Sequence, residues 1–222
     1  MQNSLLGVGL YSVSEAARLT KISPQRIRRW LRGYSLRLKD GVKIQAPVVK
    51  RAAPVGLGTV LLTFADLLEV RLVDAFLSKR VSLQTIRIAA EKAQREWGAN
   101  HPFLSRRFKV SGRTLFLELI QGPYDFLRNQ TYFREVIGPY LEDVDFDGHE
   151  ARRWWPLGRG KKVVIDPSIC LGKPIVAKHG IPTGVISMAV EADGSVDRVA
   201  RWYGISSGAV KAAVDFELHF AA

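Results

Sequence analysis

The chain has 222 residues, enough for one large domain or two to three small ones. Its 47% hydrophobic and 24% charged residues are ordinary for a globular protein and exclude disorder, a collagen-like repeat or a coiled coil as an overall description. The net charge of +12 is concentrated at one end, because residues 1–50 contain ten Lys or Arg and two Asp or Glu. Such clustering indicates that the N-terminal part binds a polyanion.

Several classes of protein are excluded by simple features of the sequence. Cys170 is the only cysteine, which excludes an intrachain disulfide and a cysteine-based zinc cluster. Residues 1–10 contain no Lys or Arg and so lack the basic start of a signal peptide. The longest uncharged stretch, residues 52–65, is shorter than the ~20 residues of a membrane-spanning helix. We therefore expect a soluble, cytoplasmic protein with no membrane partner, metal or cofactor.

The first 33 residues predict two short helices joined by a turn. Ser12 and Glu15 have the spacing of a capping box that begins the first helix. Ser23 is the expected N-cap of a second helix at Pro24–Arg32, which ends at Gly33. The apolar stripe of the second helix consists of Ile27, Trp30 and Leu31. This arrangement predicts a helix-turn-helix whose second helix reads DNA.

A basic hairpin is expected directly after the second helix. Of the possible registers, we favour a three-residue loop at Lys39-Asp40-Gly41, which pairs Leu38 with Val42 and Leu36 with Ile44. That register places four aliphatic side chains inward and Arg37 and Lys43 outward, as in the wing of a winged helix-turn-helix. The alternative is an ordinary surface hairpin that happens to be basic.

The candidate DNA-binding residues lie on the second helix and on this hairpin. Residues near the start of a reader helix face base edges, and we assign that role to Gln25, Arg26 and Arg29. The remaining candidates, which we expect to hold phosphates, are Arg28, Arg32, Arg37 and Lys43. The alternative for any single arginine is a solvated helix face.

The rest of the chain predicts further helices and a few short strands. Thr63 and Ser82 are expected to cap a third and a fourth helix. Next come a small hairpin at 108–117, a helical segment at 124–137, an acidic loop at 142–147, a basic linker that opens at 152–156, and strands at 163–165 and around 172–176. The predicted fold is mainly α with small β elements (α+β), in three parts: residues 1–100, 101–157 and 158–222.

A second helix-turn-helix outline closes the chain. Ser195 is expected to cap one helix, and Gly204 turns the chain into the last one, which begins near Ser207. The last helix offers Lys211, but Asp215 cancels that charge. Because carboxylates are repelled by phosphates, we expect this pair to pack or to bind protein rather than DNA.

Two resemblances give these patterns a biological setting. Residues Tyr11–Trp30 look like the start of a MerR-type winged helix-turn-helix, a likeness that extends to about Trp97. It implies a dimeric transcription regulator bound to an inverted-repeat operator. The stretches 163–176, 180–183 and 196–205 resemble a small uncharacterised domain common in VapB-type antitoxins, whose partner toxins have a PIN-like ribonuclease fold. Joined, they imply a homodimeric antitoxin that represses its own operon on double-stranded DNA and neutralises a toxin.

The segment 151–162 offers candidates for the toxin contact, because PIN-like nucleases hold Mg²⁺ in an acidic cleft that a cationic segment can occupy. These candidates are Arg152, Arg153, Trp154, Trp155 and Arg159. The alternative is that the tryptophans anchor a linker whose charges are solvated.

The four histidines have no spacing suited to catalysis, so we expect no enzyme. The alternative functions are a one-component MerR-like regulator with a ligand-sensing or dimerising C-terminal region, and a structural DNA-binding adaptor.

Overall fold

The structure, a computed structural model, describes residues 8–38, 41–49, 60–98, 101–104, 138–147 and 150–220. These residues fall into two compact units. The N-terminal unit takes its described residues from 11–142 and 146–151, and the C-terminal unit takes most of its residues from 152–222. The described residues are mainly helical with small sheets, which confirms the predicted α+β fold class.

The helices of the N-terminal unit begin where the capping residues predicted. Ser12 accepts a hydrogen bond from the amide of Glu15, whose carboxylate accepts from the Ser12 amide, and Thr63 and Asp66 repeat this capping box. Ser82 caps the fourth helix. The helices of this unit include α1 (Val13–Thr20), α2 (Pro24–Arg32), α3 (Phe64–Ser78), α4 (Leu83–Trp97) and the short 3₁₀ helix η1 (Pro102–Leu104), and residues 138–142 are helical as well.

The helix-turn-helix core is held by the apolar stripe of α2. Ile27, Trp30 and Leu31 are buried against the other helices, as the 3.6-residue period predicted. The carbonyl of Trp30 then accepts hydrogen bonds from the amides of Val48 and Val49, at 2.8 and 3.3 Å. These bonds bring the chain that follows the hairpin back against the end of α2.

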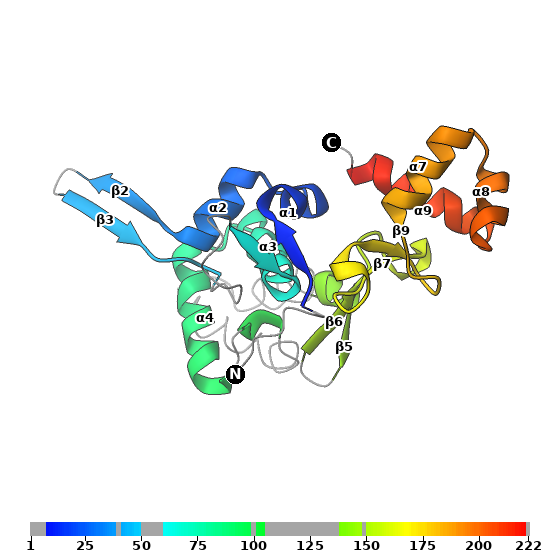
Figure 1. The fold of residues 1–222 in the computed structure, drawn as a ribbon. Helices are drawn as coiled ribbons and strands as arrows, with labels where there is room; N and C mark the ends of the chain where they lie inside the picture. The colour runs from blue at the N-terminus through cyan, green and yellow to red at the C-terminus, as the bar shows by residue number, and fades with distance from the viewer. Residues whose placement is uncertain are drawn as a thin grey trace, which may run out of the picture. The chain divides into compact units, whose positions relative to one another are not determined.

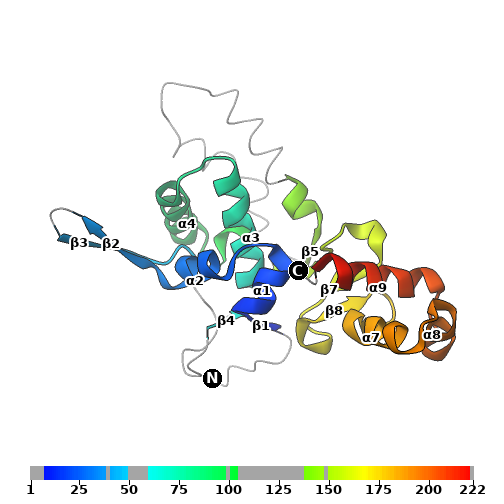
Figure 2. The same ribbon diagram turned by 90° about the horizontal axis from the view of Figure 1, so that it is seen from above.

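Gly33 separates α2 from the hairpin and has to be glycine. Its φ of +74° is in the left-handed region, and a Cβ at this position would lie 2.2 Å from the carbonyl oxygen of Gln45. The hairpin, β2 (Tyr34–Leu38) and β3 (Gly41–Gln45), extends away from the helices in both views (Figures 1 and 2). A second two-stranded sheet joins β1 (Leu10–Ser12) to β4 (Leu61–Thr63).

The predicted register of the hairpin was wrong by one residue. The structure pairs Tyr34 with Gln45, Ser35 with Ile44, Leu36 with Lys43, Arg37 with Val42 and Leu38 with Gly41. The expected inward positions were also wrong for Val42 and Ile44, which are 65% and 80% exposed. Register is specified by a face that must be buried. Because the described side chains of β3 are exposed apart from half-buried Gln45, the hydrophobic pattern could not select one.

The C-terminal unit combines strands and three packed helices (Figure 1). It contains β7, β8 and β9 whole and residues 144–145 and 152–154 of β5 and β6, all from one five-stranded sheet of order β5-β6-β7-β8-β9 in which β7 pairs antiparallel with both β6 and β8. The strands are β5 (Val144–Asp147), β6 (Glu150–Trp154), β7 (Val163–Ile165), β8 (Pro174–Val176) and β9 (Ile181–Pro182). The helices are α7 (Thr183–Asp193), α8 (Val196–Tyr203), α9 (Ser207–Phe220) and the 3₁₀ turns η2 (Arg159–Lys161) and η3 (Cys170–Gly172).

The core of this unit lies where the three helices meet β8. Val176 of β8 packs with Ile186 of α7, Val199 of α8 and Val210 of α9, all at most 1% exposed. The predicted helices after Ser195 and Gly204 and the predicted strands at β7 and β8 are confirmed. None of the described helices has the length and apolar character needed to cross a membrane.

Other predictions for this part of the chain need correction. Helix α7 was missed, and residues 150–154, expected to lie in or just before the opening of a linker, form strand β6. The acidic stretch expected as a loop contains β5. The predicted hairpin at 108–117 and the helical segment at 124–137 lie outside the described residues.

Candidate nucleic-acid interface

The exposed side of α2 carries the cations of the candidate interface. Ser23 and Pro24 begin the helix, and burial of its apolar stripe turns Gln25, Arg28 and Arg32 to the surface. In the part of the chain that the structure describes, neither Arg28 nor Arg32 forms an ion pair or a ring contact. Their guanidinium groups can therefore take phosphate oxygens without breaking an internal contact.

Arg26 differs from its neighbours because it is committed to the fold. Its Nη2 atom lies 2.7 Å from Oδ1 of Asp74 on α3, and its guanidinium carbon lies 4.9 Å from the ring centroid of Trp30. The side chain is 49% exposed, so it lies at the surface but leans on α3. A base edge would have to compete with Asp74 for this guanidinium.

Arg29 connects α2 to the hairpin. Its guanidinium carbon lies 3.7 Å from the ring centroid of Tyr34, the first residue of β2. Stacking uses the face of the guanidinium, whereas its N–H donors lie in the plane. The stack therefore orients Arg29 and leaves its donors available for hydrogen bonds to a base or a phosphate.

The two basic residues predicted on the hairpin lie on opposite faces. In the observed register Lys43 shares a face with Tyr34, and Arg37 shares the other face with Ile44. Both side chains are exposed. Because Arg29 stacks on Tyr34, Lys43 extends the exposed surface of α2 and Arg37 does not.

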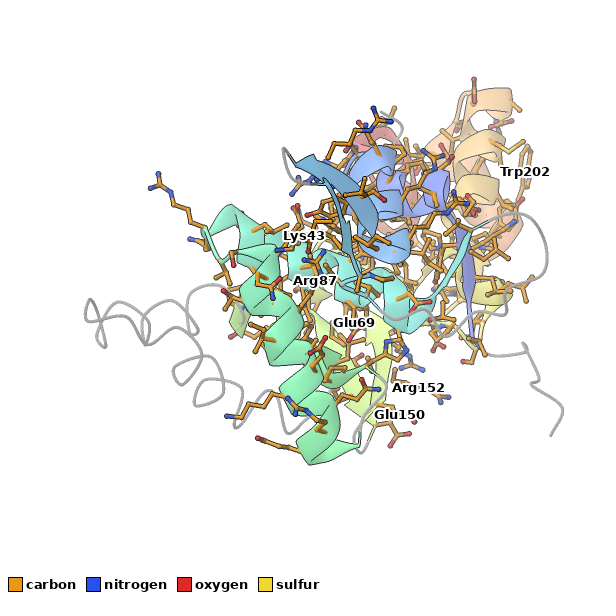
Figure 3. The ribbon with its side chains drawn as sticks, turned by 90° about the vertical axis from the view of Figure 1, so that its left-hand side faces the viewer. Lys43, Glu69, Arg87, Glu150, Arg152 and Trp202 are labelled. Atoms are coloured by element: carbon orange, nitrogen blue, oxygen red, sulfur yellow. The ribbon has the colours of Figure 1, made fainter. Side chains whose placement is uncertain are left out.

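Arg87 of α4 holds the base of the hairpin, a role that the sequence analysis missed. Its Nε donates to the carbonyl of Ala46 at 3.0 Å, its Nη1 donates to Oε1 of Gln45 at 3.1 Å, and its guanidinium carbon lies 5.9 Å from the Tyr34 ring. The residue is 8% exposed. Figure 3 shows Arg87 in the region between Lys43 and Glu69. Nothing local in the sequence marks it, because its partners are more than 40 residues away.

Arg87 and Glu69 both line a small cavity of about 30 Å³. Two buried atoms at this cavity, Oε1 of Glu69 and Nη2 of Arg87, have no hydrogen-bond partner among the described residues. The volume is that of about one water molecule, which could bridge the carboxylate and the guanidinium.

Glu69 is paired on its other side with a histidine. Its Oε2 lies 3.1 Å from Nδ1 of His101. Burial raises the pKa of the Glu69 carboxyl. Burial alone would lower the pKa of His101, but the hydrogen bond and the charge of Glu69 outweigh it and raise that pKa. The folded unit therefore holds a proton on this pair more tightly than the separate groups would.

The residues predicted to contact a toxin are mostly engaged within the C-terminal unit. Trp154 is 2% exposed, pairs with Ile165 of β7, and lies in the sheet. Arg153 donates through Nε to Oδ2 of Asp166 at 2.7 Å. Burial would raise the pKa of the Asp166 carboxyl, but hydrogen bonds from Ser168 and Arg153 hold it below its usual range. Arg153 is thus a partner of a buried carboxylate.

Trp155 and Arg159 converge on one carboxylate, and Arg152 stands apart from them. The indole Nε1 of Trp155 donates to Oδ2 of Asp145 at 2.9 Å, and Arg159 forms an ion pair with the same carboxylate. Arg152 is exposed on β6 (Figure 3). Among the described residues, no group of three or more His, Cys, Asp or Glu side chains could hold a metal ion.

Two families of known proteins match the chain, one in each of its two compact units. Residues 9–90 match a family described as "Putative DNA-binding HTH domain". This match covers α1, α2, the hairpin and α3. Residues 163–216 match a family described as "Protein of unknown function (DUF433)". Residues 9–90 are thus similar to a helix-turn-helix family described as putatively DNA-binding.

Individual proteins resemble the chain over nearly its whole length. A protein of Mycobacterium tuberculosis described as "Putative antitoxin VapB45" is 23% identical over 224 positions, which cover 94% of this chain and 93% of that protein. The crystal structure of Rv2018 from Mycobacterium tuberculosis matches with a TM-score of 0.73 and 20% identity, over 95% of this chain and 99% of that one. The second likeness shows that both units follow a known fold.

Proposed function

We propose that the chain is the antitoxin of a toxin–antitoxin pair, with duplex DNA bound by the N-terminal unit and a toxin bound by the C-terminal unit. The observation that carries the DNA-binding half is the surface formed by Arg28, Arg32, Arg29 on Tyr34, and Lys43. It combines cations that have no ion pair among the described residues with one pre-oriented guanidinium, which suits phosphate and base contacts respectively. The end-to-end similarity to a protein described as an antitoxin supports the toxin-binding half.

The finer parts of the proposal follow from the same reasoning. The DNA is the operator of the chain's own operon, and the protein represses it as a homodimer, because one reader helix covers too few base pairs for a useful operator. The toxin is a PIN-like ribonuclease. We propose no catalytic role for the chain.

Two measurements test this function. Purified protein should retard the duplex that precedes its own gene in a gel-shift titration, and Arg29→Ala should weaken that binding by about 1–3 kcal/mol. Co-expression with the product of the neighbouring nuclease gene should restore growth that the nuclease alone arrests. Failure of both the retardation and the growth rescue would overturn the proposal.

A toxin-contact variant has to respect the contacts within the C-terminal unit. Arg153→Glu would place a second carboxylate beside buried Asp166 and would test folding rather than binding. Arg152→Glu changes an exposed residue for which the structure gives no ion pair, and it is the cleaner variant. We expect it to weaken growth rescue while duplex binding stays unchanged. Full rescue would remove Arg152 from the toxin surface.

A further inference from the structure

The C-terminal unit contains a large groove that the proposed function does not yet use. It encloses about 770 Å³ and lies beside strands β7 and β8 and the start of α9. Its floor is apolar and includes Val164 and Ile175, which are 4% and 2% exposed. A cavity of this size with an apolar floor fits the volume range of ligand sites in proteins.

Positive charge dominates the walls of this groove. Arg153, Arg159, Lys162 and Lys178 line it, and Asp166 is the one carboxylate among the lining residues. Asp166 is already matched by Arg153. The lysines form no ion pair within the described ranges, so the groove presents cations that no internal carboxylate neutralises.

The backbone holds both lysines in an unusual conformation. Lys162 and Lys178 have φ angles of 60° and 72°, in the left-handed region that residues with a Cβ rarely adopt. The amide of Ala177 donates to the carbonyl of Lys162 at 2.8 Å, which ties the two turns together. Non-glycine residues in this conformation are strained, and such strain clusters at ligand sites. Glycine or asparagine would adopt this conformation more readily than lysine does. The backbone conformation therefore does not account for a lysine at either position, and its positive charge does.

We infer that this groove receives an acidic segment of a partner protein, with carboxylates on Lys162 and Lys178 and apolar side chains on the floor. The inference rests on the proposed antitoxin function for the identity of the partner, which is the toxin. It also reverses the expected geometry. From the sequence we expect cations of this chain to occupy an acidic cleft of the toxin. Because the cations line a concave surface, an acidic segment of the toxin instead binds in a groove of this chain.

Two features favour a peptide over a nucleic acid. A polynucleotide would require exposed aromatic faces for its bases along a continuous cationic track. Two aromatic rings, Trp155 and His179, are among the lining residues, and the indole N–H of Trp155 is held by Asp145, so the groove offers no continuous series of stacking faces along its described lining. The apolar floor instead suits aliphatic side chains placed between carboxylates, as in an acidic amphipathic segment.

The test uses the purified full chain and a fluorescein-labelled peptide of glutamate, aspartate and leucine, followed by fluorescence anisotropy. The variant is Lys162→Asn with Lys178→Asn, because asparagine tolerates the left-handed conformation and should not destabilise the fold. The matched control is Lys173→Asn with Lys211→Asn, which removes the same charge from exposed positions outside the groove.

We expect the groove variant to bind the peptide at least about tenfold more weakly at unchanged thermal stability, and the control within about twofold of the wild type. Equal loss in both variants would overturn the inference, as would binding of a glutamine and asparagine version of the peptide with equal affinity. Tighter, groove-dependent binding of single-stranded polyuridine would overturn it in favour of a nucleic acid. Displacement by an equal carboxylate concentration of free glutarate would overturn it in favour of a small ligand. Because neither toxin nor operator DNA is present, failure here is distinguishable from failure of the growth rescue.

Discussion

Arg29 of α2 and Tyr34 of the hairpin form one stacked unit, with the guanidinium carbon 3.7 Å from the ring centroid. The contact joins the element expected to read base edges to the element expected to hold phosphates. Arg87 reaches the same ring from α4 at 5.9 Å and bonds to Gln45 and Ala46. Helix α2, the hairpin and α4 are therefore coupled at one aromatic ring.

The stack predicts that the tyrosine ring contributes to DNA binding without touching DNA. Tyr34→Ala should weaken duplex affinity by about 1 kcal/mol, because Arg29 would lose the ring that orients its guanidinium. Tyr34→Phe keeps the ring and should bind like the wild type. The measurement is an anisotropy titration of the full chain with labelled duplex. If phenylalanine lost as much affinity as alanine, the hydroxyl rather than the stack would be responsible.

Arg26 and Arg28 lie two positions apart on α2, but their replacement should affect stability and duplex affinity differently. Arg26→Ala removes the ion pair with Asp74, which is partly exposed, and should cost at most about 1 kcal/mol of unfolding free energy. Arg28→Ala should leave stability unchanged and weaken duplex binding more than Arg26→Ala does. Denaturant titration and duplex titration of the two variants give both quantities. A greater loss of DNA affinity for Arg26→Ala would show that Arg26 leaves Asp74 to contact DNA.

The buried pair of Glu69 and His101 predicts a pH dependence of stability with a definite sign. The folded state raises the pKa of both groups, so it binds their protons more tightly than the unfolded chain. The contribution of His101 is fully present below its ordinary pKa of 6.5 and is lost as the pH rises through the higher folded-state value. Thermal unfolding should therefore show stability that falls as the pH rises above about 6.5.

Replacing the carboxylate provides the control for this pH dependence. In Glu69→Gln the burial of His101, the largest influence on its pKa, would remain while the charge of Glu69 would be gone, and the charge of Asp66 would still raise the pKa in part. Burial then lowers the pKa of His101, and the His101 contribution to stability should rise as the pH increases through about 6.5. An unchanged slope in the variant would show that the pair does not govern this range.

Two capping boxes of the N-terminal unit offer a matched comparison of burial. Thr63 and Asp66 are 3% and 0% exposed, whereas Glu15 in the box formed with Ser12 lies at the surface. Thr63→Ala should cost about 2 kcal/mol and Ser12→Ala about 0.5–1 kcal/mol, because the first leaves a buried amide without a partner. Denaturant unfolding measures both. Equal costs would show that water reaches the amide of Asp66.

The elements that could be predicted from the sequence are those whose signals are local. The N-caps at Ser12, Ser23, Thr63 and Ser82 fixed the start of four helices within one residue. Helix α7 was missed because its N-cap is Pro182, which offers no side-chain hydrogen bond. Strand β6 was missed because it is defined by its pairing with β7, and its sequence has no alternation of polar and apolar residues that would predict a strand.

The candidate site divides in the same way. The arginines of α2 are apparent from the sequence because they lie within one short helix. Neither the ion pair of Arg26 with Asp74 nor the bonds of Arg87 to the hairpin could be predicted, because each joins residues more than 40 positions apart. The register of the hairpin, and with it the separation of Arg37 from Lys43, had no buried face to specify it.

The central claim is that the exposed arginines of α2 neutralise phosphates of duplex DNA. The most direct test is the salt dependence of duplex affinity for the full chain, for Arg28→Ala with Arg32→Ala, and for Lys173→Ala with Lys211→Ala as control. Each phosphate contact removed should lower the slope of log affinity against log salt by about 1, so the arginine variant should lose about 2. The lysine control should keep the wild-type slope. An arginine variant with the wild-type slope and affinity would contradict the assignment of this surface to DNA.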